Sequence, residues 1–270
     1  MFHTRPVESL DLPELAPYRT MRRPVDHVRQ RLFVAEGDKV VRRLLESQCA
    51  VVSALMPEKW VDQLAPLLEA RPEDIPVFIA PKALLEQLIG FSMFQGVMAV
   101  GRFPEPASVH SILQRSARPH LFLALEGLSN AENLGVIVRN AVAFGAQGLI
   151  VGETCSTPYL RRAVRNSMGT IFKLPVVEPP SLTACLGELR ARGIRCLAAH
   201  GPARLTLAQA DLAQDCCIVL GGEGYGLSDR VLQTCDEAIS IPMANRVDSL
   251  NVGNAGAVFL YEANRQRGLM

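Results

Sequence analysis

Short apolar runs alternate with amphipathic stretches along most of the chain, and this alternation constrains the fold more than any other feature of the sequence. The apolar runs predict buried strands at residues 32–35, 49–55, 75–80, 96–102, 121–125, 148–151, 172–177, 195–199, 217–220 and 238–241. The stretches between them have helical spacing, and a final helix is expected at about residues 250–267. Strands that alternate with helices form a mostly parallel sheet, which binds ligands at the carboxyl ends of its strands. We therefore expect an α/β protein.

A proline-rich segment at residues 104–119 interrupts this alternation and separates two α/β series. We expect an N-terminal arm (1–20), a first α/β domain (21–103), this linker, and a second α/β domain (120–270).

Composition excludes several classes of protein. With 49% hydrophobic residues the chain can bury a large core, yet no apolar run approaches the ~18 residues of a membrane helix. The first eleven residues include Arg5, Glu8 and Asp11, unlike a secretory signal. Seven cysteines without a C-x-x-C spacing, and histidines without a metal-binding motif, argue against disulfides and metal sites. We expect a cytoplasmic protein that needs neither a metal nor a membrane.

Polar or glycine-rich segments follow three of the expected strands. After the first, a helix carries Glu132, Gly135 and Arg139 on one face. Helix capping by Ser129 or Asn130, with an ion pair between Glu132 and Arg139, explains this segment equally well when it is taken alone.

The second segment, residues 217–229, places four glycines around Glu223. Leu227 occupies the position of the third glycine of a dinucleotide fingerprint, and the Gly-Lys-Ser/Thr of a P-loop is missing. Four glycines within six residues favour a loop that approaches a ligand closely. The third segment places Ser249 before a helix with Gly253, Gly256 and Ala257, a small face suited to close helix packing or to a dimer contact.

In this order and spacing, the three segments together resemble the motifs of the SpoU (TrmH-like) branch of the SPOUT RNA methyltransferases. The resemblance covers about residues 121–267. The matching residues are Asn133, Gly135 and Arg139 for the first motif, Gly221, Glu223 and Gly224 for the second, and 241–243 with 249–252 for the third. The chain departs from the family at Gly253 and Asn254, where Ser-Val is common.

This resemblance implies a SPOUT α/β domain with a C-terminal trefoil knot, a homodimer formed through that domain, and S-adenosylmethionine as the cofactor. By position it implies cofactor contacts from Gly221, Gly222, Gly224, Ile241, Met243 and Leu250. A looser resemblance, at residues 33–37 and 95–97, likens the first domain to the L30e-like RNA-binding domains that many members carry.

The same resemblance implies methylation of a ribose 2′-hydroxyl in RNA. Ribosomal RNA is favoured over transfer RNA, because members with the L30e-like extension more often act on ribosomal RNA. The implied catalytic residues are Arg139, Asn133, Glu223, Asn251 and Ser249. A guanidinium has a pKa above ~12, so we interpret Arg139 as a fork that holds a phosphate and stabilises the developing alkoxide rather than as a base. Glu223 would orient Asn133 or Arg139, or favour the positive charge of the sulfonium, unless it only stabilises its own loop. Asn251 and Ser249 would hold the loop and the substrate ribose; capping of the final helix is the alternative for Ser249, and both can hold at once.

The net charge of +1 does not by itself indicate a nucleic-acid partner, so local clusters of arginine matter more. Two such clusters are candidate RNA-binding sites. On charge alone a solvated helix face is the favoured explanation, and the family resemblance raises RNA binding above it. The two clusters comprise Arg22, Arg23, Arg29 and Arg31, and Arg161, Arg162 and Arg165.

Two other functions compete with methyl transfer. A ribosome-assembly protein that binds RNA without catalysis could keep the same fold, but it would not need Arg139, Glu223 and Asn251 together. A nucleotide-dependent oxidoreductase would fit the α/β alternation, but the failed glycine fingerprint disfavours it.

Overall fold

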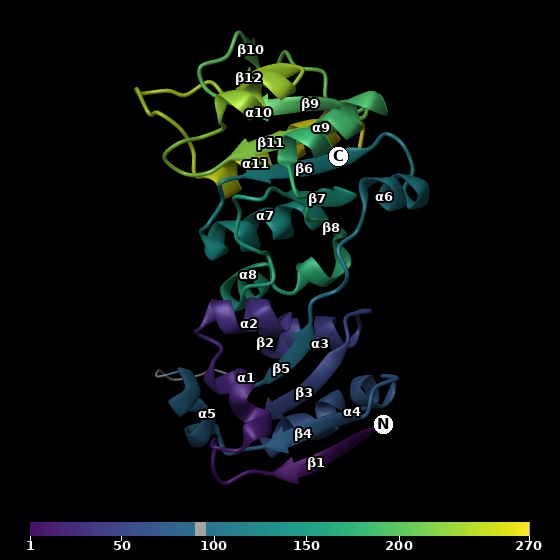
Figure 1. The fold of residues 1–270 in the computed structure, drawn as a ribbon, viewed down its shortest axis with the longest axis vertical. Coiled ribbons are helices and arrows are strands. Elements are labelled where there is room, and N and C mark those ends of the chain that lie inside the picture. The colour runs from purple at the N-terminus through teal and green to yellow at the C-terminus, as the bar shows by residue number, and fades with distance from the viewer. Residues whose placement is uncertain (90–95, 270) are drawn as a thin grey trace. The chain divides into compact units, whose positions relative to one another are not determined.

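The computed structural model describes residues 1–89 and 96–269, which form two compact units, each with its own sheet (Figure 1). Unit 1 contains Met1–Glu105 and Pro158–Phe172, and unit 2 contains Pro106–Thr157 and Lys173–Met270. Gln95, on which part of the L30e-like resemblance rests, lies outside the described residues.

Unit 1 is built on a mixed five-stranded sheet with the order β1-β4-β3-β5-β2. Strands β1 and β3 run parallel to β4, and β5 pairs antiparallel with β2 and β3. The strands are β1 Phe2–Pro6, β2 Leu32–Glu36, β3 Val51–Met56, β4 Ile75–Ile79 and β5 Met98–Arg102. The sequence predicts an arm at residues 1–20, the region that contains β1. Four of its five residues are exposed, so pairing with β4 rather than an apolar pattern holds it in the sheet.

Short helices cover this sheet. In α3 the apolar stripe of Val40, Val41, Leu44 and Leu45 is fully buried, as its helical spacing predicts. The helical stretch between the strands expected at 49–55 and 75–80 divides into a 3-10 turn, Glu58–Trp60, and α4. The helices of unit 1 are α1 Ala16–Arg19, α2 Pro24–Gln30, α3 Asp38–Leu45, α4 Val61–Glu69, α5 Lys82–Ile89 and α8 Arg161–Asn166, with a 3-10 turn at Pro13–Leu15.

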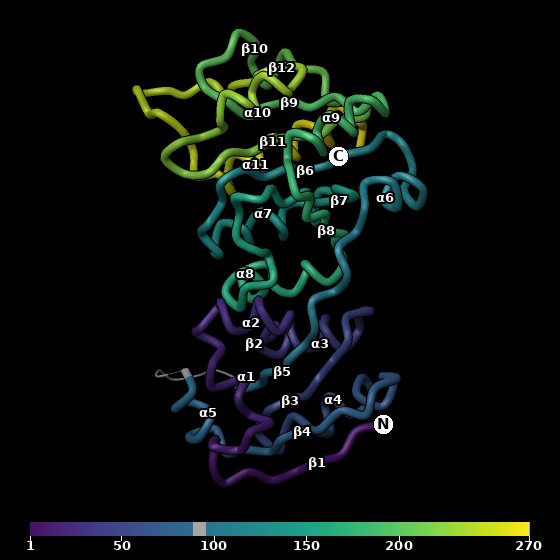
Figure 2. Tube along the Cα trace, viewed as in Figure 1, coloured from purple at the N-terminus to yellow at the C-terminus, as the bar shows by residue number. Residues whose placement is uncertain are grey.

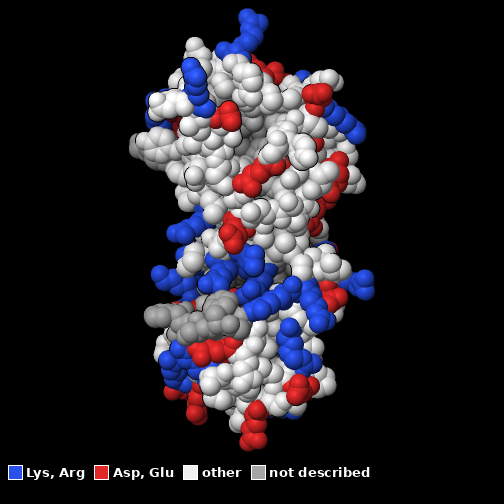
Figure 3. Space-filling model, turned by 90° about the vertical axis from the view of Figure 1, so that its left-hand side faces the viewer, with Lys and Arg blue, Asp and Glu red and all other residues white. Residues whose placement is uncertain are grey.

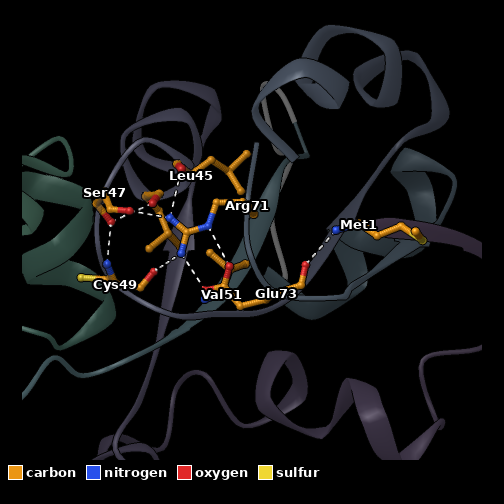
Figure 4. Close-up of polar contacts among 8 residues, drawn as sticks. Met1, Leu45, Ser47, Cys49, Val51, Arg71 and Glu73 are labelled. Atoms are coloured by element: carbon orange, nitrogen blue, oxygen red, sulfur yellow. Dashed lines mark hydrogen bonds and ion pairs between the residues drawn. The ribbon is translucent and has the colours of Figure 1, made fainter. Parts of the chain in front are cut away.

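Arg71 ties the turn between α3 and β3 to the chain before β4 (Figure 4). Its buried guanidinium donates to the carbonyl oxygens of Leu45 (3.2 Å), Ser47 and Cys49 (2.8 Å), and to both carboxylate oxygens of Glu73 (2.9 and 2.6 Å). These bonds use all five N–H donors of the side chain. Hydrogen bonds from Arg71 are the main reason why the pKa of Glu73 is lowered.

Unit 2 contains a seven-stranded sheet with the order β10-β12-β9-β11-β6-β7-β8, in which every recorded strand pair is parallel. The α/β fold with mostly parallel strands is thus confirmed. The strands are β6 Leu121–Glu126, β7 Gly148–Val151, β8 Val176–Val177, β9 Arg195–Ala199, β10 Leu205–Thr206, β11 Cys216–Gly221 and β12 Glu237–Ser240.

Helices pack on both faces of this sheet. Alternate strand residues such as Phe122, Cys196 and Val219 face a core completed by α6, α9 and α10. On the other face, the Cβ that Gly256 lacks would touch Leu220, and α11 packs against α7. The helices are α6 Val109–Arg115, α7 Ala131–Ala143, α9 Leu182–Ala191, α10 Asp229–Thr234 and α11 Val252–Gln266.

The strand expected at 172–177 is mostly wrong. Thr170–Lys173 forms a 3-10 turn, and only Val176–Val177 is a strand. Pro175 has no N–H to donate to a neighbouring strand. Only its carbonyl oxygen takes part in the sheet, by accepting a hydrogen bond from the Leu149 amide at 3.0 Å. Within the described part of the chain, no helix has the length and apolarity to cross a membrane, and no group of three or more side chains is arranged to hold a metal ion.

We expect Arg71→Lys to lower the free energy of unfolding of unit 1 by about 2 kcal/mol, because lysine has three donors and leaves buried carbonyl oxygens unpaired. Trp60 is the only tryptophan and lies in unit 1, so its fluorescence during urea unfolding measures the change. The pKa of Glu73 is lowered in the folded protein. The ionised carboxylate of Glu73 therefore stabilises the fold fully above its unfolded-state pKa of about 4.3, and this stabilisation is lost as the pH falls through the folded-state pKa. The difference in free energy of unfolding between the wild type and Arg71→Lys should therefore become smaller in acid.

Arg5→Lys is the matched control, because the ion pair of Arg5 with Glu14 is half-exposed. It should change the free energy of unfolding by less than about 0.5 kcal/mol. Equal losses from the two variants would contradict the structural role of Arg71.

Candidate functional site

The loops after β6 and β11 meet at the carboxyl edge of the sheet of unit 2. The two strands are parallel neighbours, and Gly221 pairs with Glu126 at their ends. A Cβ on Gly222 would overlap the carbonyl oxygen of Gly127, and one on Gly221 would overlap the backbone of Gly226. Only glycine allows these backbones to come so close.

The glycine-rich loop is closed on itself and anchored at its far end. The Gly226 amide donates to the Gly222 carbonyl oxygen at 3.0 Å. Ser228, which caps α10, donates to Glu126 through its amide (2.8 Å) and its hydroxyl (2.7 Å). The anchoring role of Glu126 was not predicted, although a carboxylate at the end of an expected strand is a signal that could have indicated it.

Asn133, Glu223 and Asn251 form a hydrogen-bonded network that joins the three segments. Asn133 Nδ2 donates to Glu223 Oε1 at 2.5 Å, while Asn251 Nδ2 donates to the same oxygen at 2.9 Å and to Asn133 Oδ1 at 3.0 Å. Asn251 Oδ1 accepts from the Gly253 amide at 2.9 Å and so caps α11. Glu223 is thus hydrogen-bonded to Asn133, and the role of orienting Asn133 stays a prediction.

The network leaves a hydrogen-bond acceptor available to a ligand. Glu223 is exposed, and its Oε2 accepts no hydrogen bond from the described residues. Asn133 itself is buried, so its amide is fixed in position beside an exposed carboxylate. A negatively charged oxygen on a fixed support suits a cationic or hydrogen-bond-donating group of a ligand.

Arg139 lies near this network but is not part of it. It is six residues beyond Asn133 on α7, about 9 Å further along the helix axis. Its neighbour Asn140 donates to the Gly253 carbonyl oxygen at 3.0 Å, which places this part of α7 against the start of α11. Arg139 is exposed, and no hydrogen bond or ion pair joins its side chain to any residue that the structure describes, Glu132 included.

The remaining predicted residues of the third segment lie on the chain between β12 and α11 (Figure 2). Ser249 and Leu250 are exposed, and Ile241 and Met243 are half-buried. Because Asn251 caps α11, capping does not explain Ser249, whose side chain contacts no polar partner among the described residues.

Residues after β7 support the loop that follows β6. The Gly127 amide donates to Thr154 Oγ1 at 2.9 Å, and the Leu128 amide donates to Cys155 Sγ at 3.3 Å. Burial raises the pKa of the Cys155 thiol, which donates to the Leu125 carbonyl oxygen at 3.4 Å. These residues were not predicted, because nothing in a single sequence indicates that two loops 27 residues apart are in contact.

The two predicted arginine clusters both belong to unit 1, where Lys and Arg side chains gather on the surface (Figure 3). The helices α2 and α8 both contact β2. Four of the seven arginines are exposed and have no side-chain partner in the described ranges: Arg22, Arg23, Arg29 and Arg162.

The other three arginines are engaged in contacts within unit 1. Arg161 and Arg165 (3.1 Å) form ion pairs with the buried carboxylate of Glu36. Arg31 donates to the Pro104 carbonyl oxygen at 2.8 Å and lies over the Phe103 ring. The guanidinium groups of these three arginines thus already bind other residues of unit 1.

Comparisons with known proteins agree on one family. Residues 120–261 match the family model described as the SpoU rRNA Methylase family. An uncharacterized tRNA/rRNA methyltransferase of Mycobacterium tuberculosis is 34% identical, over 94% of this chain and 90% of that protein.

Solved structures share the fold. The SpoU methyltransferase AviRb from Streptomyces viridochromogenes, in complex with the cofactor AdoMet, has a TM-score of 0.81 at 26% identity and covers 95% of this chain and 98% of its own. An RNA 2′-O ribose methyltransferase has a TM-score of 0.77 at 27% identity, with both chains fully covered.

The network can be tested by exchanging its donor and acceptor. Asn133→Asp puts two carboxylates in contact and should lower the free energy of unfolding of unit 2 by about 1–3 kcal/mol at neutral pH. Adding Glu223→Gln supplies an amide that donates to the carboxylate introduced by the first substitution, and it should restore most of the loss. Thermal and urea unfolding of the wild type, both single variants and the double variant measure the coupling. Additive losses would show that the side chains do not interact.

Proposed function

The chain belongs to the SpoU rRNA Methylase family, and from this premise we propose that it transfers a methyl group from S-adenosylmethionine to the 2′-hydroxyl of a ribose in RNA. The observation that carries the proposal is the network of Asn133, Glu223 and Asn251, which joins the three family motifs at one edge of a parallel sheet. The 2′-hydroxyl is favoured by the likeness to the RNA 2′-O ribose methyltransferase.

The loops of unit 2 fit the proposed methyl donor, which supplies a transferable methyl group on a positively charged sulfur. Gly221 and Gly222 let the loops after β6 and β11 pack backbone against backbone at the edge of the sheet, which would shape the place where the donor binds. Leu250 is 39% exposed and Met243 is half-buried, so apolar surface is available for an adenosine. Gly224 and Ile241 complete the proposed binding residues.

Arg139 has the properties needed to hold the acceptor. Its guanidinium is exposed and free of partners in the described part of unit 2, so it can form a forked contact with a phosphate. Bound in this way, it would fix the ribose in line with the methyl group and stabilise negative charge on the 2′-oxygen as its proton leaves. Ser249 and Asn251 would hold the ribose, and Glu223 would keep Asn133 and Asn251 in place.

Further parts of the proposal concern the whole protein. The exposed arginines Arg22, Arg23, Arg29 and Arg162 would contact RNA phosphates, with Arg31, Arg161 and Arg165 supporting them. Unit 1 would act as an L30e-like RNA-binding domain, and ribosomal RNA is the favoured substrate. A knotted, homodimeric second domain in the cytoplasm completes the proposal.

The test incubates the protein with methyl-labelled S-adenosylmethionine and separated ribosomal and transfer RNAs, and then maps the label by alkaline hydrolysis. A 2′-O-methyl group blocks cleavage at its own nucleotide, so we expect label in an alkali-resistant dinucleotide of ribosomal RNA. Label on a base would reject the ribose assignment. RNA binding without any label would favour the non-catalytic alternative.

We expect Arg139→Lys to lower kcat at least about a hundredfold while S-adenosylmethionine still binds, because lysine keeps the charge but loses the fork. Calorimetry measures donor binding, and the labelling assay measures turnover. Arg192→Lys is the matched control, since Arg192 is a surface arginine paired with Glu188, and it should leave both measurements unchanged. Near-normal turnover by Arg139→Lys would exclude the proposed role.

A further inference from the structure

Tyr225 is the most solvent-exposed large apolar side chain among the described residues, with its full surface in water. It lies on the glycine-rich loop of unit 2, two residues after Glu223. A single exposed aromatic is ordinary on a protein surface. Its position next to the network of the proposed site is not explained by the packing of the fold.

The turn that carries Tyr225 is held in place at its base. The Gly226 amide donates to the Gly222 carbonyl oxygen, and the two residues form an isolated antiparallel bridge. Gly222 is packed against Gly127, so the base cannot shift without opening the contact between the two loops. The ring is therefore presented from an anchored turn.

The surroundings of the ring are open. Gly224 and Gly226 flank Tyr225, both at positive φ (91° and 66°), and a Cβ on either would have no neighbour within 4 Å. No ring contact or hydrogen bond of the Tyr225 side chain occurs within the described ranges. Both faces of the ring are thus accessible to a flat partner.

Chain geometry places this ring beside the proposed reaction. Two trans peptide units separate the Cα atoms of Glu223 and Tyr225, so these atoms are at most about 7.6 Å apart. Glu223 is hydrogen-bonded to Asn133 and to Asn251, and Asn251 would hold the target ribose. A nucleotide adjoining that ribose would lie within reach of the tyrosine ring.

From these observations we propose that Tyr225 is a substrate-binding residue that stacks on an unpaired nucleobase of the RNA, next to the methylated ribose. The inference rests on the proposed function and names the substrate class more closely. Proteins that read single-stranded RNA stack its bases on aromatic side chains, and a base in a duplex has no free face to offer. The substrate is therefore a loop or single-stranded segment, not a continuous helix.

The kinetic test compares three substitutions at this position, with ribosomal RNA as the methyl acceptor. Tyr225→Ala should raise KM for RNA about tenfold to a hundredfold, with kcat and the Kd for S-adenosylmethionine unchanged. Tyr225→Phe keeps the ring and should match the wild type. Tyr225→Leu is the matched control, because it keeps apolar surface without an aromatic face and should resemble Tyr225→Ala.

A spectroscopic test does not depend on turnover. In a Trp60→Phe background, Tyr225→Trp places the only tryptophan of the protein on the loop. A single-stranded oligoadenylate should quench its fluorescence, and the same strand paired with oligouridylate should not. Quenching would support the inference even if no methylation were found, which keeps its outcome separate from that of the proposed function.

Other outcomes would overturn the inference. Unchanged KM for Tyr225→Ala, with methylation intact, would leave the proposed function standing and remove the role of Tyr225. Weaker donor binding in that variant would assign the ring to the methyl donor, and a changed oligomeric state would assign it to a contact between copies. Absence of quenching by the single strand, or equal quenching by the duplex, would also contradict base stacking.

Discussion

The hydrogen bonds that Glu223 Oε1 accepts from Asn133 and Asn251 are the interaction on which the arrangement of the candidate site depends. They connect residues 90 and 28 positions apart in sequence, so they are possible only when the loops after β6 and β11 and the start of α11 are brought to one place. Such partly exposed bonds each contribute only about 1 kcal/mol to stability. Their main effect is to fix the geometry of three side chains before a ligand binds.

Two arginines show how burial decides the use of the same side chain. Arg71 is buried, and its five donors are all bound to backbone carbonyl oxygens and to Glu73, so its role is to hold unit 1 together. Arg139 is exposed and has no partner in the described part of the chain, so its donors are available to a ligand. The sequence singled out Arg139 through its place in the first family motif, but it did not indicate the role of Arg71, because the carbonyl oxygens that Arg71 binds come together only in the fold.

The sequence predicted what depends on local patterns. Apolar periodicity located β7 and β9 to the residue. The glycines around Glu223 predicted a loop that approaches a ligand closely, which stays a prediction, whereas Gly221 and Gly222 bring two backbone segments of the chain itself together. It did not predict what depends on distant partners. The edge strand β1 is held by pairing with β4, and Glu36 is 125 residues from Arg161. Tyr225 was not singled out either, because its exposure follows from the path of the folded loop.

The proposed chemistry makes recognition of the RNA a separate problem from catalysis. Every nucleotide carries the same ribose 2′-hydroxyl, so contacts to ribose and phosphate position an acceptor without choosing one. Selection must then come from features that differ between RNA sites, such as an unpaired base or the spacing of phosphates. In the proposed function the polar network and Arg139 would bind the common groups, whereas the exposed ring of Tyr225 on its anchored turn and the cationic surface of unit 1 would contact the variable ones. A methyltransferase built in this way can change its target by altering these surfaces while its reacting groups stay the same.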